Sequence, residues 1–247
     1  MCLINFRKSF ITSGLLKNMT DIHSHILFGV DDGIKCYEDT VISLRWLKSY
    51  GISRILLTPH IMSDFPENTT IFLSKSFDLL KKRLEYDGVK DIPELRLGAE
   101  YMIESTIEKH KNDGFITYKD RYILVETSYM TPPMGFIGIL EKLMEDGYSP
   151  VLAHPERYIY MDKNDYIFLK TMGMKFQLNY LSIIGTYGKM AKNKAIRMLN
   201  DSYYDYAGSD FHDLSRHRED FFSKCLKRKH IEKLQQLFDN NKELWQD

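Results

Sequence analysis

Short apolar stretches of this chain repeatedly end in a side chain that can bind a metal ion, and this pattern constrains the fold more than any other feature. Each stretch has the length and residue types of a β-strand, and longer charged segments with helical periodicity separate the stretches. We expect amphipathic helices over residues 38–50, 72–86 and 136–146. The expected strands are residues 20–25, 54–60, 94–102, 122–127, 149–154, 175–181 and 204–212. Because strand and helix alternate, the sequence predicts an α/β fold with a parallel sheet.

The chain has 247 residues and carries no internal repeat or linker-like tract, so we expect a single domain over residues 19–247. Residues 1–18 are interpreted as a basic, partly apolar N-terminal leader. At this length, seven strand–helix units can close into a barrel or remain an open, doubly wound sheet. Periodicity alone does not choose between the two.

Composition excludes several classes of partner. Lys plus Arg and Asp plus Glu both number 34, so the net charge is zero and the chain as a whole attracts neither nucleic acid nor an anionic membrane. The 3 cysteines are isolated, which disfavours a disulfide framework and a cysteine-based zinc site. No apolar stretch is long enough for a signal peptide or a membrane span. We therefore expect a cytoplasmic protein with no direct membrane insertion.

The polar residues at the strand ends form a pattern of their own. His23 and His25 are spaced i, i+2, which places both on one face of a strand, and Asp210 and His212 repeat this spacing in the last expected strand. The carboxyl ends of parallel strands open on one rim, so residues scattered along the sequence converge there. The candidate metal ligands are His23, His25, Asp32, His60, Glu100, Glu126, His154, Asp210 and His212.

The chemistry of these side chains narrows the choice of metal. Imidazole nitrogen and carboxylate oxygen without thiolate suit zinc, manganese or iron(II), and the many oxygen donors favour Mn²⁺. Nine candidate ligands exceed what one ion can hold. We expect two or three clustered ions that share a bridging carboxylate.

Six segments resemble the PHP (polymerase and histidinol phosphatase) family of metal-dependent phosphoesterases, especially the bacterial manganese-dependent tyrosine-protein phosphatases of capsule and exopolysaccharide clusters. The resemblance covers about residues 19–218. Its most specific parts are DIHSH at 21–25, GVDDG at 29–33, TPH at 58–60, GAEY at 98–101, HPER at 154–157 and GSDFH at 208–212.

The resemblance implies a distorted (β/α)7 TIM-like barrel, the PHP fold, with a trinuclear site at its carboxyl rim. Glu100 would be the bridging ligand. One ion would take His23, His25, Glu100 and Asp210, a second Asp32, His60 and His212, and a third Glu100, Glu126 and His154.

The resemblance also assigns catalytic roles. Arg157 falls where the phosphatase branch has an arginine that holds the substrate phosphate, and the planar guanidinium suits that task. A second such arginine is expected after the final Asp-x-His; Arg216 and Arg218 are both candidates, and we favour Arg216. Asp32 is expected to act in catalysis as well as in metal binding.

These residues predict a metal-dependent protein-tyrosine phosphatase. Clustered divalent ions make hydroxide available to attack phosphorus, and a phenolate leaves without strong general-acid help. Neither Cys36 nor Cys225 begins a Cys-x5-Arg segment, so a cysteinyl-phosphate route is not indicated. The resemblance implies that the partner is a phosphotyrosine protein, namely a bacterial tyrosine kinase of polysaccharide assembly. A small-molecule phosphatase, for example of histidinol phosphate, and a non-catalytic barrel that binds and regulates a kinase remain alternatives.

Other segments carry weaker expectations. Loops 61–70 and 128–134 follow ligand-bearing strands and are expected to rim the pocket. Residues 218–247 are expected to form one or two helices that pack on the domain. His110 and His230 are interpreted as solvated, and His217 is left open because it lies close to the site in sequence.

Overall fold

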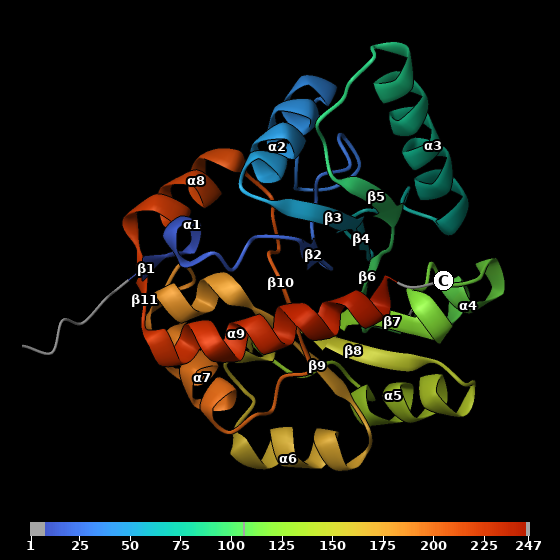
Figure 1. The fold of residues 1–247 in the computed structure, drawn as a ribbon. Coiled ribbons are helices and arrows are strands. Elements are labelled where there is room, and N and C mark those ends of the chain that lie inside the picture. Colours follow the sequence, from blue (N-terminus) through green and yellow to red (C-terminus); the bar gives the residue numbers. More distant parts are fainter. Residues whose placement is uncertain (1–7, 106, 246–247) are drawn as a thin grey trace, which may run out of the picture.

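The main strands form two parallel sheets that are continuous with each other through two bent strands (Figure 1). The fold is a computed structural model that describes residues 8–105 and 107–245. One sheet has the order β10-β9-β8-β7-β6-β4 and the other β2-β3-β5. Their bounds are β2 Met19–Asp21, β3 Ile52–Leu57, β4 His60–Ile61, β5 Glu94–Leu97, β6 Glu100–Met102, β7 Tyr122–Glu126, β8 Ser149–Ala153, β9 Lys175–Asn179 and β10 Tyr206–Gly208. The mixed α/β fold with parallel sheets predicted from the sequence is therefore confirmed.

Two of the expected strands are each broken into two shorter ones. Residues 54–60 divide between β3 and β4, and residues 94–102 divide between β5 and β6. Pro59 has no N–H to offer the ladder at the first break. Gly98 lies at the second, where a Cβ would come within 2.5 Å of the Tyr118 ring. Both strands bend at the same level, so β3 pairs with β5 in one sheet and β4 with β6 in the other.

The far edges of the two sheets meet at a single point. Ser24, after β2, forms an isolated parallel bridge with Phe211, after β10. The backbone there is tied on both sides, because His25 N–H donates to Phe211 O at 2.8 Å and Asp210 N–H donates to His23 O at 2.9 Å. The first and last of the expected strands therefore lie next to each other although they are far apart in sequence.

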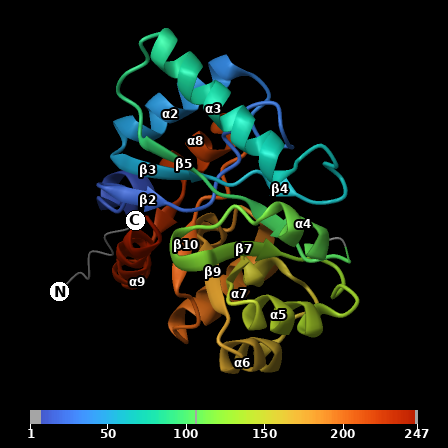
Figure 2. The same cartoon turned by 90° about the vertical axis from the view of Figure 1, so that its right-hand side faces the viewer.

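Helices lie outside the strands. The three helices predicted from periodicity are confirmed as α2 Tyr37–Ser49, α3 Thr70–Tyr86 and α5 Phe136–Glu145. Figure 2 shows α2 and α3 beside β3 and β5, and α5 and α6 beside β7 and β9. The other helices are α1 Phe10–Ser13, α4 Ile107–Asp113, α6 Lys163–Thr171, α7 Gly188–Asn200, α8 Leu214–Ser223 and α9 Arg228–Asn240, with short 3-10 turns at η1 Lys119–Arg121, η2 Pro155–Arg157, η3 Tyr180–Ile184 and η4 Asn241–Leu244.

Buried apolar side chains form two clusters. The larger one includes the inner faces of the helices and the strand residues opposite them. The smaller one brings strand residues from both sheets together with the C-terminal residues Leu244 and Trp245. Its members are Ile22, Leu56, Tyr118, Leu124, Val151, Ala153, Tyr206, Leu244 and Trp245.

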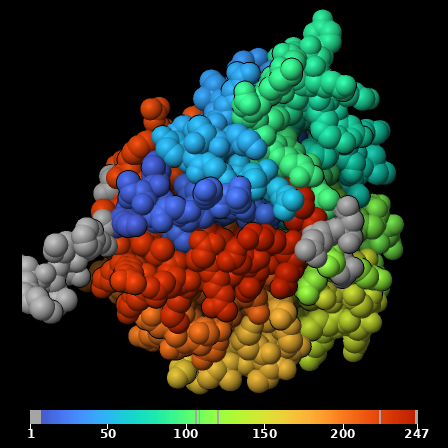
Figure 3. Space-filling view, viewed as in Figure 1, coloured from blue at the N-terminus to red at the C-terminus, as the bar shows by residue number. Residues whose placement is uncertain are grey.

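The C-terminal helix α9 lies beside the N-terminal segment. Figure 3 shows α9 running along the surface beside the N-terminal segment, and Asn241 links the two because its Nδ2 donates to the carbonyls of Thr20 and Ala207. β1 Lys8–Ser9 pairs antiparallel with β11 Cys225–Leu226. The helices expected within residues 218–247 are confirmed as the end of α8 and α9. In the part of the chain that the structure describes, no helix is long and apolar enough to cross a membrane.

One histidine expectation is wrong. His230 is only 3% exposed and lies on the inner side of α9, four residues before the core residue Leu234. The helical spacing of i, i+4 places the two on the same face, and the charged residues around His230 in sequence hid this position.

Gly33 gives a direct test of the packing under the site. A Cβ there would lie 2.1 Å from the carbonyl oxygen of His25, a backbone atom that cannot move aside easily. We expect Gly33→Ala to lower the free energy of unfolding by about 1–3 kcal/mol, as overpacking does in other proteins. Chemical denaturation measures this.

Gly138 is the matched control. It lies inside α5 with open space around its Cα, so Gly138→Ala should be neutral or stabilising by up to about 1 kcal/mol. Equal stabilities of the two variants would contradict the close packing at Gly33.

Candidate metal centre

The structure brings all nine candidate ligands together where the strands end. Ligand atoms within 4.8 Å of one another define three overlapping groups. The groups are His23, His25, Glu100 and Asp210; His25, Asp32, His60 and His212; and His60, Glu100 and Glu126. His154 is adjacent, with its Nε2 3.1 Å from Glu100 Oε1.

The first group is fully buried and its ligand atoms converge. The Nε2 atoms of His23 and His25 lie 3.1 Å apart. Glu100 Oε2 is 3.1 Å from the first and 3.3 Å from the second, and Asp210 Oδ1 lies 3.4 and 3.5 Å from them. Two imidazoles and two carboxylates thus face a common point.

The other ring nitrogen of each histidine is held by a neighbour. His23 Nδ1 donates to Gln177 Oε1 at 2.9 Å, and Gln177 Nε2 is itself fixed on Leu178 O. His25 Nδ1 donates to Asp31 Oδ2 at 2.8 Å. Donation from Nδ1 leaves the lone pair on Nε2, the atom that faces the cluster, as is usual for metal-binding histidines.

The second group reaches the surface through Asp32. Asp32 Oδ1 lies 3.4 Å from His60 Nε2 and 3.3 Å from His212 Nε2, and the His25 and His212 rings stack at 3.9 Å. Hydrogen bonds from His212 and His60 hold the pKa of Asp32 far below its usual range. This carboxylate is therefore ionised throughout the neutral range and acts only as an acceptor.

The third group holds two buried atoms that face each other without a hydrogen bond. His60 Nδ1 lies 3.0 Å from Glu126 Oε1, yet neither atom has a hydrogen-bond partner among the described residues. Burial and His25 by themselves lower the pKa of His60, but the carboxylates of Asp32, Glu126 and Glu100 raise it to about 10. The ligand set expected for the third ion is Glu100, Glu126 and His154. The geometric group has the same two carboxylates, with His60 in place of His154.

The donor set fits divalent cations. Burial by itself lowers the pKa of His23, but Glu100 and Asp210 raise it overall, and burial by itself raises the pKa of Glu100, but His23 and His154 lower it overall. Positive charge is thus favoured at a place where buried carboxylates and imidazole lone pairs converge. Nitrogen and oxygen donors without sulfur suit manganese, iron(II) or zinc.

Two of the candidate ligands have a strained backbone conformation. His154 has φ +33° and Asp210 has φ +54°, the left-handed region that side chains other than glycine rarely adopt. His154 directly follows β8, and Asp210 lies two residues after the end of β10. Residues held in this region cluster at functional sites, where the surrounding structure compensates for the strain.

A cavity of about 240 Å³ opens above the cluster and holds two arginines. Arg157 lies between the rings of Tyr129 and Tyr187, at 4.4 and 4.3 Å, and its guanidinium contacts Asp210 Oδ2 at 2.6 Å. Arg216 also lines this cavity, with its guanidinium 4.8 Å from the Tyr187 ring. Arg218, the alternative to Arg216, lines a different groove.

Both loops expected at the rim contact the site. Tyr129, from loop 128–134, lines the cavity. In loop 61–70, the Phe65 ring stacks on His60 at 5.9 Å and Asn68 Nδ2 donates to His60 O at 2.7 Å.

Three residues near the site were missed by the sequence analysis. Asp31 is next to Asp32 in sequence, and no sequence pattern distinguishes their roles. In the structure, the carboxylate of Asp31 accepts hydrogen bonds from His25 Nδ1, His60 N–H and Gly33 N–H. Gln177 belongs to a strand without an expected ligand, and Tyr187 lies in a segment for which no element was predicted. Strand alternation places Gln177 and Asn179 on one face, and this signal could have indicated Gln177.

These features define a parallel α/β protein with a candidate multinuclear metal centre. Residues 19–244 match the family model described as "Capsular polysaccharide synthesis, CpsB/CapC". The chain belongs to this family.

Named relatives agree with this membership. Tyrosine-protein phosphatase YwqE of Bacillus subtilis is 30% identical over 201 residues, which cover 79% of this chain and 78% of YwqE. Tyrosine-protein phosphatase CpsB of Streptococcus pneumoniae is 29% identical over 235 residues, which cover 90% of this chain and 96% of CpsB.

Solved structures show the same likeness. One of them comes from a study of YwqE of B. subtilis and CpsB of S. pneumoniae, which that study describes as unique metal-dependent tyrosine phosphatases. It matches with a TM-score of 0.72 and 28% identity, and the match covers 80% of this chain and 81% of that one. An inactive dihydroorotase-like domain of a Chaetomium thermophilum CAD-like multifunctional protein matches with a TM-score of 0.55 and 13% identity, covering 94% of this chain and 80% of that one. This second match shows a likeness of fold alone.

His217, left open by the sequence, is buried beside the cavity. Its Nδ1 donates to Asp213 O at 3.0 Å, while Nε2 has no hydrogen-bond partner in the described part of the chain. Burial lowers the pKa of His217 to about 4, against an ordinary value of 6.5.

A buried neutral histidine makes stability depend on pH. His217 contributes stability above about pH 6.5, and this contribution is lost as the pH falls toward 4, because the unfolded chain then binds a proton that the folded chain does not. Between pH 7 and 5 the loss is about 2 kcal/mol. We expect His217→Asn, measured by denaturation in EDTA, to lose correspondingly less stability over this range than the parent protein. Identical pH slopes for the two proteins would show that His217 is not buried in the neutral form.

Proposed function

We propose that the chain is a metal-dependent protein-tyrosine phosphatase. One observation carries this proposal: a buried imidazole–carboxylate cluster suited to divalent ions shares a cavity with two guanidinium groups suited to phosphate, those of Arg157 and Arg216. The named relatives in the same family support the reaction type.

We further propose that the strands close into a distorted (β/α)7 barrel over residues 19–247, on which residues 8–18 pack through the buried side chains of Phe10, Leu15 and Leu16. The parallel bridge from Ser24 to Phe211 supports closure, since it joins the outer strands of the two sheets. The smaller apolar cluster supports it too, because its side chains come from strands of both sheets, as the filling of a barrel interior does.

The metal ligands are proposed to be the nine converging residues, with Glu100 as the bridge. Its Oε2 contacts nitrogen atoms of His23, His25 and His60, and its Oε1 contacts Nε2 of His154. Mn²⁺ is the proposed native ion because four of the nine ligands are carboxylates. When bound, such ions lower the pKa of water toward neutrality and offset phosphate charge.

The arginines are proposed to bind the phosphoryl oxygens. Two tyrosine rings contact the guanidinium of Arg157 and restrict its motion, so less rotational freedom is lost when an anion binds. Asp210 competes for the same guanidinium, and it faces His23 and His25 with its other oxygen. Asp32 lies at the open side of the cluster, where its ionised carboxylate can orient the attacking water.

An aryl phosphate suits this site better than an alkyl one. The phenol of tyrosine has a pKa of about 10, so its anion leaves far more easily than a serine alkoxide. The cavity of about 240 Å³ also has room for one aryl phosphate. The proposed partner is a phosphorylated tyrosine kinase of bacterial polysaccharide assembly, in the cytoplasm.

Replacing His23 and His25 together by Ala tests the proposal. Both Nε2 atoms face the same point, so the double variant should lose at least one bound ion per chain and about 100-fold or more of its phosphotyrosine-peptide hydrolysis. Metal analysis and phosphate release measure the two effects.

His110→Ala is the control, because His110 lies on α4 beside Tyr101 and outside the cluster. Unchanged turnover in the double variant would contradict the site. Hydrolysis of histidinol phosphate but not of phosphotyrosine peptide by the parent protein would instead make this a small-molecule phosphatase, and metal-free protein without hydrolysis would favour the regulatory barrel.

A further inference from the structure

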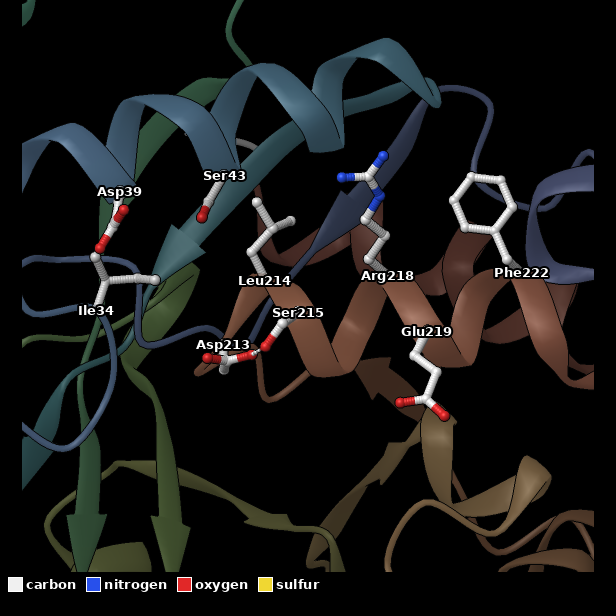
Figure 4. A pocket seen from close by; sticks show the side chains of 9 residues that line it. All are labelled: Ile34, Asp39, Ser43, Asp213, Leu214, Ser215, Arg218, Glu219 and Phe222. Atoms are coloured by element: carbon white, nitrogen blue, oxygen red, sulfur yellow. Dashed lines mark hydrogen bonds between the residues drawn. The ribbon is translucent and has the colours of Figure 1, made fainter.

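A groove of about 660 Å³ lies between α2 and α8, outside the metal centre (Figure 4). Its α2 wall carries Asp39 and Ser43, and its α8 wall carries Arg218 and Phe222. Figure 4 shows side chains from the two helices pointing into the space between them. The function proposed above does not use this groove.

The groove adjoins the catalytic cavity along α8. Asp213, the residue before the first turn of α8, lines both spaces. Beyond it, Arg216 and His217 face the cavity, whereas Arg218 and Phe222 face the groove. A ligand that enters the cavity past Asp213 therefore has the groove directly beside it.

The two spaces differ in size and in chemistry. The cavity holds about 240 Å³ and is lined by ionisable groups. The groove holds about 660 Å³ and combines apolar surface from Ile34, Leu214 and Phe222 with charged groups. Such a volume accommodates several side chains of a peptide, whereas the cavity accommodates one aryl phosphate.

The charges of the groove indicate which peptide it suits. Three carboxylates line it, those of Asp39, Asp213 and Glu219, against the single guanidinium of Arg218. Ser43, on the α2 wall, is fully buried and its hydroxyl has no hydrogen-bond partner among the described residues. Phe222 keeps 51% of its surface exposed, an apolar area that a ligand can cover.

We propose that this groove binds the peptide segment next to the phosphotyrosine and favours apolar and basic residues in it. This inference rests on the function proposed above. A phosphotyrosine seated in the cavity must leave its own backbone at the cavity mouth, and the groove begins there. The surplus of carboxylates supplies the preference for Lys or Arg, and Phe222 supplies apolar contact.

Another groove of the molecule provides the matched control. It lies between α5 and α6, holds about 550 Å³ and shares no lining residue with the catalytic cavity. Phe168 lines it and is 49% exposed, nearly the same as Phe222. The two phenylalanine side chains thus have nearly the same exposed fraction, but only Phe222 lines the groove that adjoins the cavity.

The first experiment compares two substrates in the parent protein and in two variants. The substrates are p-nitrophenyl phosphate, which fills the cavity only, and a phosphotyrosine peptide with Leu and Lys beside the phosphotyrosine. We expect Phe222→Ala to raise KM for the peptide about fivefold and to leave kcat/KM for p-nitrophenyl phosphate unchanged. Phe168→Ala should change neither value.

Asp39→Asn tests the charge preference separately. It should raise KM for the Lys peptide about threefold and leave KM unchanged for the same peptide with Lys replaced by Gln. Thermal melts and size-exclusion chromatography accompany each variant.

The outcomes are distinct. A parent protein that hydrolyses p-nitrophenyl phosphate but no phosphotyrosine peptide would overturn the proposed function itself. A parent protein that hydrolyses the peptide, with Phe222→Ala and Asp39→Asn unchanged, would overturn the groove alone. Equal losses on both substrates, or a change of oligomeric state in Phe222→Ala, would also overturn it, since the groove would then support the cavity or bind a second copy.

Discussion

The structure depends on the burial of one carboxylate, that of Glu100. Its side chain is wholly inaccessible to solvent, and its two oxygens lie within 3.3 Å of nitrogen atoms from His23, His25, His60 and His154. A carboxylate without such partners would cost several kcal/mol to bury. The four imidazoles come from three different segments, which follow β2, β3 and β8, so this one side chain requires these strand ends to meet at a point. The same convergence of imidazoles that forms the site is therefore what allows the fold to bury the carboxylate of Glu100.

The backbone near the site follows from that requirement. β3 and β5 bend after Leu57 and Leu97, so His60 and Glu100 begin β4 and β6 in direct register with each other. His154 and Asp210 leave their strands through left-handed conformations that direct their side chains into the cluster. Asp31 and Gln177 then fix the far side of two imidazoles, and two tyrosines fix Arg157. Most of the polar groups here serve to orient other groups, as is common around metal centres.

The sequence predicted which side chains converge at the strand ends better than it predicted their surroundings, and the reason is physical. A ligand at the end of an apolar run carries two signals, strand periodicity and a polar stop, so His60, Glu100 and His154 could be found. Neither of these two signals distinguishes Asp31 from Asp32. Tyr187 lies outside the strands, and it reaches the site only because of the path that the chain takes after η3. Periodicity also could not show that residues 54–60 and 94–102 each break into two strands, because it does not include the effect of Pro59 on the ladder or the close approach of the Tyr118 ring to Gly98. His230 was misjudged since its sequence neighbours are charged while its helix neighbours at i+4 are apolar.

The central claim is that the strand ends form a metal centre bridged by Glu100, and crystals grown with Mn²⁺ test it most directly. Anomalous differences collected on both sides of the manganese absorption edge locate the ions and identify them. The account predicts two or three peaks within bonding distance of the nine residues, with Glu100 coordinating at least two ions. Peaks away from these side chains, or a single ion that Glu100 does not contact, would contradict it.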